Sequence, residues 1–187
     1  MMTTHISTYS ESKSVAKDIF LVFSASILIC LFSNLSIYLP FTPVPIVTQN
    51  HAILLLALML GAKRGFIATF LFLTYGALNF PVFAGSFGGI AKFFGPTGGY
   101  LIGYLCAAYF VGYMSERASS RTPLTAFTIM GLGSLIIHLC GFVALSFWTG
   151  MVKAVLLGFL PFVVGDIFKI VVGVKLAQVM RWTQKTI

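Results

Sequence analysis

Charged side chains are scarce in this chain: they make up 9% of its 187 residues, and only four of them are acidic. A soluble domain carries about 25% charged residues. Hydrophobic residues account for 58% of the chain instead. The composition therefore excludes an ordinary soluble domain and predicts an all-α membrane protein, whose length suits about six transmembrane helices of ~20 residues.

The residues that carry metal or redox chemistry are also few. Cys30, Cys106 and Cys140 lie in apolar runs and form no CxxC or Cys/His ligand pair, so we expect buried small hydrophobes and no metal site. His51 and His138 are lone residues in apolar segments, where a hydrogen-bonded packing role is expected. No Ser/His or Asp/His pairing has the spacing of a nucleophile and its base, so an enzyme is not expected.

Basic residues outnumber acidic ones and give a formal net charge of +8. They are scattered singly between apolar runs, so no basic stripe follows a phosphate backbone and nucleic-acid binding is not expected. The run Gly-Pro-Thr-Gly-Gly-Tyr at 95–100 lacks the Lys-Ser/Thr ending of a phosphate-binding loop and predicts a tight turn into a helix. No cofactor is therefore expected, and any ATP hydrolysis must come from another polypeptide.

Polar and apolar stretches divide the chain. Residues 1–17 are predicted to form a flexible cytoplasmic tail, and residues 18–187 a single six-helix transmembrane substrate-binding domain. The first apolar run is too long for a signal peptide and has no small-residue cleavage site. The predicted helices cover Ile19–Leu39, Thr48–Ala62, Phe66–Asn79, Thr97–Ser115, Pro123–Phe147 and Pro161–Arg181.

The positions of the 12 basic residues predict the orientation. Only Lys92 and Lys153 fall on one side of the membrane under this topology, and Lys169 lies within it. The other nine basic residues share the opposite side. The positive-inside rule assigns that side to the cytoplasm, so both termini are predicted to be cytoplasmic. A proline-rich loop at 39–45, a glycine-rich loop after Pro81 and a capping segment at 148–160 then gather on the outer face. The residues on the cytoplasmic side are Lys13, Lys17, Lys63, Arg64, Arg117, Arg121, Lys175, Arg181 and Lys185.

Asp166 is the one acidic residue within an apolar stretch, and Lys169 follows it one helical turn later. A charge at membrane depth costs several kcal/mol, so such residues face a cavity, a partner or a ligand. Residues three apart share a helix face and can neutralise each other. The pair is therefore either a structural brace or, as we favour, a polar clamp for a small molecule bound near the outer face.

Four motifs follow one another along the chain and together resemble a known family. They are Val44-Pro-Ile-Val-Thr-Gln49, Gly76-Ala-Leu-Asn-Phe-Pro-Val-Phe-Ala-Gly85, Gly95-Pro-Thr-Gly-Gly-Tyr-Leu-Ile-Gly103 and Pro161-Phe-Val-Val-Gly-Asp-Ile-Phe-Lys169. Their order and spacing resemble the BioY family, the biotin-specific S components of energy-coupling-factor (ECF) vitamin transporters. The resemblance covers about residues 20–180. One departure is Val47, where the family usually has Thr; here the hydroxyl moves to Thr48.

The resemblance implies high-affinity binding and uptake of biotin across the bacterial cytoplasmic membrane. It also implies partners: a transmembrane coupling protein and two cytoplasmic ATPase subunits, beside the lipid bilayer and, as an open question, a second copy of the chain. Biotin would be the transported substrate and not a cofactor. The pocket residues that the likeness assigns are Gln49, Phe83, Ser86, Lys92, Tyr100, Asp166 and Lys169.

The chemistry of biotin suggests a role for each of these residues. An ionised carboxylate only accepts hydrogen bonds, so Asp166 suits the ureido N–H groups, and Lys169 can donate to the ureido oxygen. Lys92 can neutralise the valerate carboxylate in a charge-assisted bond. The other polar and aromatic residues would satisfy remaining hydrogen bonds and cover the ring: Gln49, Ser86, Phe83, Phe87 and Tyr100.

Two other functions stay open at this stage. The first is a stand-alone or proton-coupled secondary transporter of a small vitamin-like carboxylate, with Asp166 as the proton relay. Inverted repeats would favour it, and no convincing repeat is found. The second is a purely structural membrane subunit, which tight binding of a vitamin by the purified chain would exclude.

Overall fold

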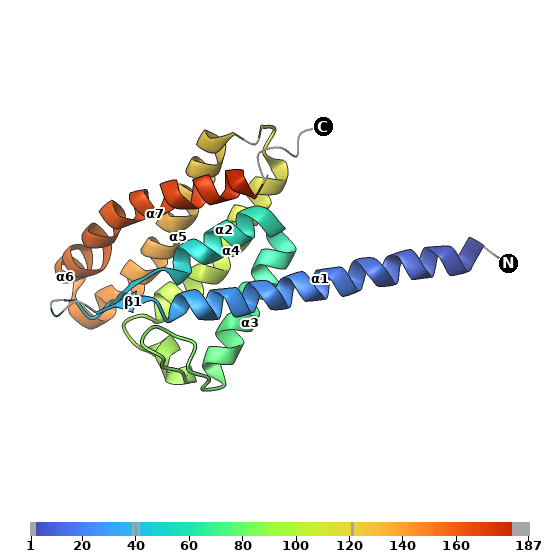
Figure 1. The fold of residues 1–187 in the computed structure, drawn as a ribbon. Coiled ribbons are helices and arrows are strands. Elements are labelled where there is room, and N and C mark those ends of the chain that lie inside the picture. Colours follow the sequence, from blue (N-terminus) through green and yellow to red (C-terminus); the bar gives the residue numbers. More distant parts are fainter. Residues whose placement is uncertain (1–2, 39, 41, 121, 181–187) are drawn as a thin grey trace.

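Helices make up most of the structure, a computed structural model that describes residues 3–38, 40, 42–120 and 122–180 (Figure 1). Leu39, Arg121, Arg181 and Lys185, which enter the predictions above, lie outside the described residues. The long helices are α1 (Thr3–Ser33), α2 (Gln49–Leu60), α3 (Ala62–Ala77), α4 (Gly98–Arg117), α5 (Pro123–Thr149) and α7 (Leu160–Val179). The short elements are β1 (Ser36–Ile37), β2 (Ile46–Val47), η1 (Ile90–Phe94), α6 (Met151–Ala154) and η2 (Val155–Phe159).

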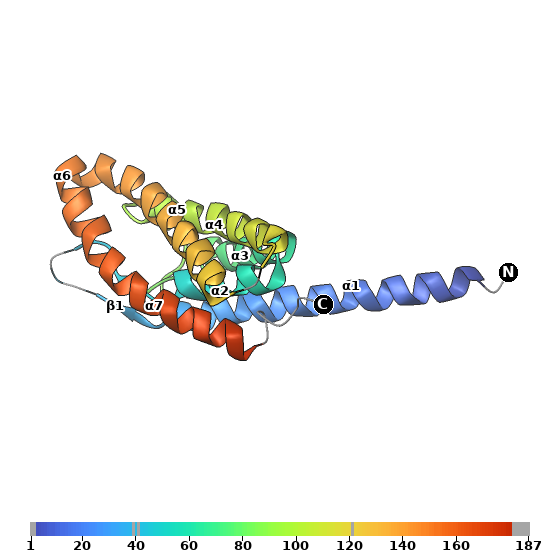
Figure 2. The same ribbon diagram turned by 90° about the horizontal axis from the view of Figure 1, so that it is seen from above.

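The first helix differs most from the prediction. α1 begins at Thr3, within the segment predicted as a tail, and ends at Ser33 rather than at Leu39. It ends early because β1 pairs with β2 in a short antiparallel ribbon, in which Ser36 lies opposite Val47. Figures 1 and 2 show α1 extending well past the rest of the bundle toward its N-terminus. The separation of residues 1–17 as a flexible tail stays a prediction.

α2 is short and central. Its 12 residues rise only ~18 Å, which is less than the ~30 Å hydrocarbon layer. The β1–β2 ribbon continues the path from its N-terminus, and α3 follows its C-terminus directly. The turn between them needs Gly61, whose φ of 84° is a left-handed conformation that side chains disfavour. The neighbouring amide of Ala62 donates to Glu116 Oε1 at 2.8 Å, which ties this turn to the end of α4.

α4 and α5 pack closely along most of their length. Gly103 of α4 faces the backbone of Ile137 on α5, and a Cβ there would lie 3.0 Å from the Ile137 Cα. Gly141 of α5 faces the Tyr100 ring in the same way. Small residues at such positions let two helices approach, which is how helices associate within a bilayer. This packing fixes the start of α4 beside the middle of α5, where the candidate site lies.

Two helices among the described residues are long and apolar enough to cross a membrane, spanning Val15–Ser33 and Pro123–Thr149. α2 is also apolar but shorter. Large apolar side chains cover the outer surface of the bundle; Phe147 is 85% exposed and Phe168 72%. An apolar surface on this scale is unusual for a soluble monomer and suits contact with lipid. The predicted helical fold class is therefore confirmed; the number of spans and the side of each terminus are taken up below.

Candidate functional site

A cavity of about 100 Å³ lies between the N-terminal ends of α2 and α4, the middle of α5 and the loop that joins α3 to α4. We call it the central cavity. Its wall is mixed, with aromatic and aliphatic groups beside amides, hydroxyls and one lysine. It is lined by Tyr38, Val44, Val47, Gln49, Asn50, Phe83, Ala84, Lys92, Thr97, Tyr100, Leu101, Tyr104, Ile137, His138 and Phe162. An apolar pocket with a few convergent polar groups is the usual form of a small-molecule site.

Gln49 places an unsatisfied acceptor on this wall. Its Nε2 donates to the Tyr104 hydroxyl at 3.0 Å, which fixes the direction of the amide. Its Oε1 is buried and makes no hydrogen bond. A buried polar atom without a partner costs free energy, so an acceptor held in this way is suited to a ligand N–H or O–H donor.

Aromatic side chains form the apolar part of the wall. The Tyr100 hydroxyl donates to the Gly158 carbonyl at 2.7 Å, which holds the ring against η2. Phe83 is buried, and its ring meets those of Phe72 and Phe93 edge to face. Both rings are fixed by these contacts and therefore present preformed apolar surface to a bound molecule.

Lys92 also lines the central cavity. Its Nζ lies 4.4 Å from the centroid of the exposed Phe87 ring, a cation–π contact of modest strength. The ammonium makes no ion pair with any described acidic residue. It is therefore available to an anionic group of a ligand.

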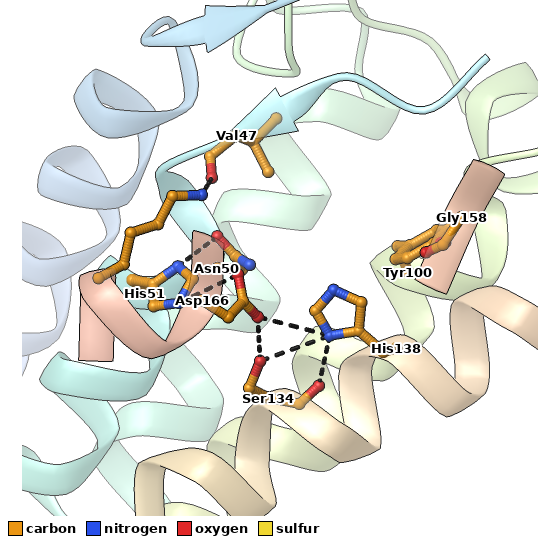
Figure 3. Close-up of polar contacts among 9 residues, drawn as sticks. Val47, Asn50, His51, Tyr100, Ser134, His138, Gly158 and Asp166 are labelled. Atoms are coloured by element: carbon orange, nitrogen blue, oxygen red, sulfur yellow. Dashed lines mark hydrogen bonds and ion pairs between the residues drawn. The ribbon is translucent and has the colours of Figure 1, made fainter. Parts of the chain in front are cut away.

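Asp166 lies beside the central cavity rather than in its wall. The carboxylate is buried, and the Ser134 hydroxyl donates to its Oδ2 (Figure 3). Two histidines flank it: His51 Nε2 is 3.4 Å from Oδ1, and His138 Nδ1 is 3.5 Å from Oδ2. The close approach of His51 is not an aligned hydrogen bond, and both Oδ1 and His51 Nε2 lack a hydrogen-bond partner.

His138 lies between the residues that line the central cavity and the polar contacts of Asp166. It belongs to the wall of the central cavity and also contacts Asp166, and Figure 3 shows it between Asp166 and Tyr100. Its Nδ1 lies 2.8 Å from the Ser134 carbonyl, so that nitrogen carries the proton and donates it. In the neutral ring the other nitrogen, Nε2, is an acceptor.

Lys169 does not pair with Asp166. Its Nζ donates to the Val47 carbonyl at 3.0 Å, and no ion pair joins the two side chains in the described structure. The direct contact suggested by their spacing is therefore absent, and each side chain bonds to another element instead. Lys169 holds α7 to the β1–β2 ribbon, whereas Asp166 holds it to α5.

Ser86 lies away from the central cavity. It is exposed in the hairpin between Phe83 and Phe87, and its hydroxyl donates to Asn34 Oδ1 at 3.0 Å. The structure thus brings Gln49, Phe83, Lys92 and Tyr100 together in one wall. It places Asp166 and Lys169 directly behind that wall and Ser86 on the outer hairpin.

The sequence comparison decides the family. A family model described as the BioY family matches residues 2–185 of the chain. The chain belongs to the BioY family. The resemblance predicted from the four motifs is confirmed, and the described helices are those of a BioY-family membrane protein.

Named relatives of this BioY-family chain include transporters from archaea and bacteria. A probable biotin transporter BioY from Pyrococcus horikoshii is 40% identical over 136 residues, which are 73% of this chain and 80% of the relative. The biotin transporter BioY of Thermotoga maritima is 38% identical over 142 residues, 75% of this chain and 83% of the relative. The biotin transporter BioY2 of Lactococcus lactis is 34% identical over 164 residues, 84% and 88% of the two chains.

A solved structure agrees with this assignment. The crystal structure of the S component for biotin from an ECF-type ABC transporter matches with a TM-score of 0.83 and 28% identity. The match covers 90% of this chain and 93% of that one. The BioY family is a family of transporters, so the expectation that the chain is not an enzyme is confirmed.

The sequence analysis did not single out Asn50, Tyr104 and His138 as site residues, yet all three line the central cavity. Tyr104 follows Tyr100 at helical i+4 spacing and so shares a helix face with a predicted residue. Asn50 adjoins Gln49 in the sequence but does not share its helix face. His138 gives no such signal. A lone histidine in an apolar run is compatible with ordinary packing, and only the approach of α5 to α7 brings it to Asp166.

Proposed function

We propose that this chain binds biotin at the central cavity and takes it up across the cytoplasmic membrane as the S component of an ECF-type transporter. The observation that carries the proposal is a set of buried, unpartnered polar atoms beside an apolar wall: Gln49 Oε1, His51 Nε2 and Asp166 Oδ1. The family and the 0.83 TM-score to a biotin S component support the identity of the ligand.

The ureido ring is assigned to the polar end of the site. Asp166 and the oriented Gln49 Oε1 accept the ureido N–H groups, and His138 Nε2 offers a further acceptor. Lys169 exchanges its bond to the Val47 carbonyl for the ureido oxygen.

The rest of biotin is assigned to the wall and to Lys92. Phe83 and Tyr100 cover the fused ring and chain with apolar surface, and Lys92 neutralises the valerate carboxylate. Ser86 is assigned an indirect role outside the central cavity. Its hydrogen bond to Asn34 holds in place the hairpin that carries Phe83. In this assignment Ser86 closes the site and does not contact the ring.

Binding requires the site to widen. Ligand pockets occupy roughly 300–1,000 Å³, whereas the central cavity has about 100 Å³. α7 is the element with room to move, because grooves flank it on both sides. One, of about 250 Å³, lies toward α1 and α2, and the other, of about 280 Å³, lies toward α5. A shift of α7 widens the cavity and brings Asp166 and Lys169 onto its wall.

We further propose six membrane crossings with both termini in the cytoplasm. The positions of the described basic residues support this orientation: Lys63, Arg64 and Arg117 lie at one end of α3 and α4, whereas Lys92 lies beyond their other end. The central cavity then opens near the outer face. Release of biotin inside requires a coupling protein and ATPase subunits, since the chain carries no nucleotide-binding motif.

A ligand screen on the detergent-purified chain tests the function. Biotin is expected to raise the thermal unfolding temperature, as any ligand that binds only the folded state does. Riboflavin, thiamine and folate at the same concentrations are expected to leave it unchanged. A larger shift with one of those vitamins than with biotin would refute the proposal.

The second candidate is a proton-coupled secondary transporter. The observation in its favour is the placement of Asp166 between two buried histidines, because intramembrane chains of Asp and His carry protons in pumps and transporters. The two candidates differ in their energy source, which a whole-cell measurement separates in the Discussion.

A further inference from the structure

A second hollow lies at the opposite end of the bundle from the central cavity. It is a groove of about 620 Å³ between α1 and α3, which we call the α1/α3 groove. It lies where the N-terminal part of α1 leaves the bundle (Figure 1). Its walls are apolar side chains: Val15, Ile19, Val22 and Phe23 of α1, Leu60 of α2, and Ile67 and Leu71 of α3. Such walls accept hydrocarbon.

Four charged residues close one end of the groove: Asp18, Lys63, Arg64 and Glu116. Arg64 Nη2 pairs with Asp18 Oδ1 at 2.7 Å, and both side chains are about two-fifths exposed. Glu116 Oε1 accepts the Ala62 amide. Lys63 makes no ion pair with any described residue. This end therefore offers two cations and two carboxylates whose charges cancel overall.

The groove has the depth of one membrane leaflet. From Lys63 to Leu71 α3 rises ~12 Å, which fits within the ~15 Å that is half of the hydrocarbon layer. In the orientation proposed above, the turn that carries Lys63 and Arg64 lies at the cytoplasmic surface. The charged end is then at the level of lipid headgroups, and the apolar walls lie beside acyl chains.

An amphipathic molecule matches this layout, because the charged side chains lie together and apolar side chains form the rest of the lining.

We propose that the α1/α3 groove binds a cytoplasmic-leaflet phospholipid with a primary-amine, zwitterionic headgroup. The phosphate lies on Lys63 and Arg64, and the ammonium lies on Asp18 and Glu116. An acyl chain follows the apolar walls. Because the charges of the groove cancel, a net anionic lipid gains no overall attraction. A trimethylammonium headgroup has no N–H with which to bind the carboxylates, so it binds more weakly.

Native mass spectrometry of the full chain in detergent tests this selectivity. The chain is offered equal amounts of phosphatidylethanolamine, phosphatidylglycerol and phosphatidylcholine with identical acyl chains. We expect about three- to fivefold more bound phosphatidylethanolamine than either competitor, the size expected from one interfacial ion pair. Lys63→Gln and Glu116→Gln are each expected to abolish the preference. Lys153→Gln, at the other end of the molecule, is the matched control and keeps it.

A second variant tests the apolar wall. Ile67→Trp fills the groove without changing its charges and is expected to lower the binding of all three lipids, whereas Leu132→Trp on the exposed face of α5 does not. Equal retention of the three lipids by the wild-type chain would overturn the headgroup assignment. Normal lipid binding by Ile67→Trp together with lost assembly with coupling subunits would make the groove a protein-docking surface instead.

The proposal depends only on the membrane orientation given above, and its failure is separable from failure of the biotin site. Biotin affinity measured on the same variants is expected to stay unchanged, because the groove and the central cavity share no lining residue. If Ile67→Trp does not fold, the two charge variants still decide between selective and unselective binding.

Discussion

At the scale of single residues, the decisive feature is a buried carboxylate whose partners are incomplete. Asp166 is 5% exposed and receives a hydrogen bond from Ser134, yet its Oδ1 has none. Removing a carboxylate from water costs several kcal/mol unless hydrogen bonds and opposite charges replace the water. A buried carboxylate that keeps an incomplete set of partners despite this cost is the arrangement expected when a ligand completes the set.

Asp166→Asn is expected to weaken biotin binding at least tenfold, or ~1.4 kcal/mol. The amide keeps the size of the side chain but replaces one acceptor oxygen with a donor that repels the ureido N–H. Isothermal titration calorimetry on the purified variant measures the change. Asp18→Asn, at the far end of the bundle, is the matched control. An affinity equal to that of the wild-type chain would remove Asp166 from the site.

Lys169→Met is expected to weaken binding of biotin by about tenfold, since a hydrogen bond to a charged group contributes roughly 1.5 kcal/mol. Methionine keeps the apolar stem, so the packing beside α2 is preserved. Lys175→Met changes an exposed lysine on the same helix and serves as the control. Desthiobiotin, which retains the ureido group, is expected to lose less affinity than an analogue without it. The reverse order would show that the ureido group does not contribute to binding, and an unchanged affinity of Lys169→Met for biotin would remove Lys169 from the site.

At the scale of elements, the turn between α2 and α3 sets the position of the site. α2 carries Gln49 and Asn50 at its start and is buried along most of its length, so its direction determines where those amides point. Gly61 allows the chain to reverse at once into α3, with φ 84° and ψ 178°. Few residues other than glycine adopt that conformation.

Gly61→Ala is expected to destabilise the folded chain by ~1–3 kcal/mol. The added Cβ would also meet the Glu116 side chain. Thermal unfolding in detergent measures the loss as a lower melting temperature. Gly131→Ala in α5 is the control, because its Cβ meets nothing within 4 Å and alanine favours helix. Equal melting temperatures for the two variants would contradict a structural role for the left-handed turn.

The boundaries of these elements show how far local signals reach. The sequence places the start of α5 at Pro123, and the structure agrees, because Thr122 caps the first turn and proline suits its first position. It places the end of the first helix at Leu39, whereas α1 ends at Ser33. Pairing of Ser36 with Val47 ends that helix, and no local signal announces a pairing between residues so far apart in sequence.

At the scale of the whole molecule, the question is what drives uptake. The chain has no nucleotide-binding motif, and its fold matches the S component for biotin from an ECF-type ABC transporter. The buried Asp166 with its two histidines leaves a proton-driven cycle as the rival explanation. The ATP-driven and the proton-driven transporter are expected to respond in opposite ways to ATP depletion and to a protonophore.

Biotin uptake by cells that express the chain with its coupling and ATPase subunits is expected to collapse on ATP depletion and to survive a protonophore when ATP is maintained. Radiolabelled biotin accumulation over minutes measures both responses. Cells that express the chain alone are the control and report any activity without partners. Uptake that survives ATP depletion but stops with the protonophore would favour the proton-coupled transporter.

The sequence by itself determined the class of the protein and several of the residues that line the central cavity. Scarce charge and long apolar runs leave only a helical membrane domain, since in lipid every backbone polar group must be satisfied within the chain. Local motifs identified the family and marked Gln49, Phe83, Lys92 and Tyr100, which line the central cavity. Composition, apolar runs and short motifs are properties of neighbouring residues, so the sequence alone reveals them.

Only the tertiary structure decided which hydrogen-bond partner each polar residue of the site has. The spacing of Asp166 and Lys169 suggested a pair, yet each bonds to a different element, Ser134 on α5 and Val47 on β2. His138 joins the site only because α5 and α7 approach each other. Spacing along one helix says which side chains share a face, but the partner across that face depends on packing between helices distant in sequence, and no single segment encodes it.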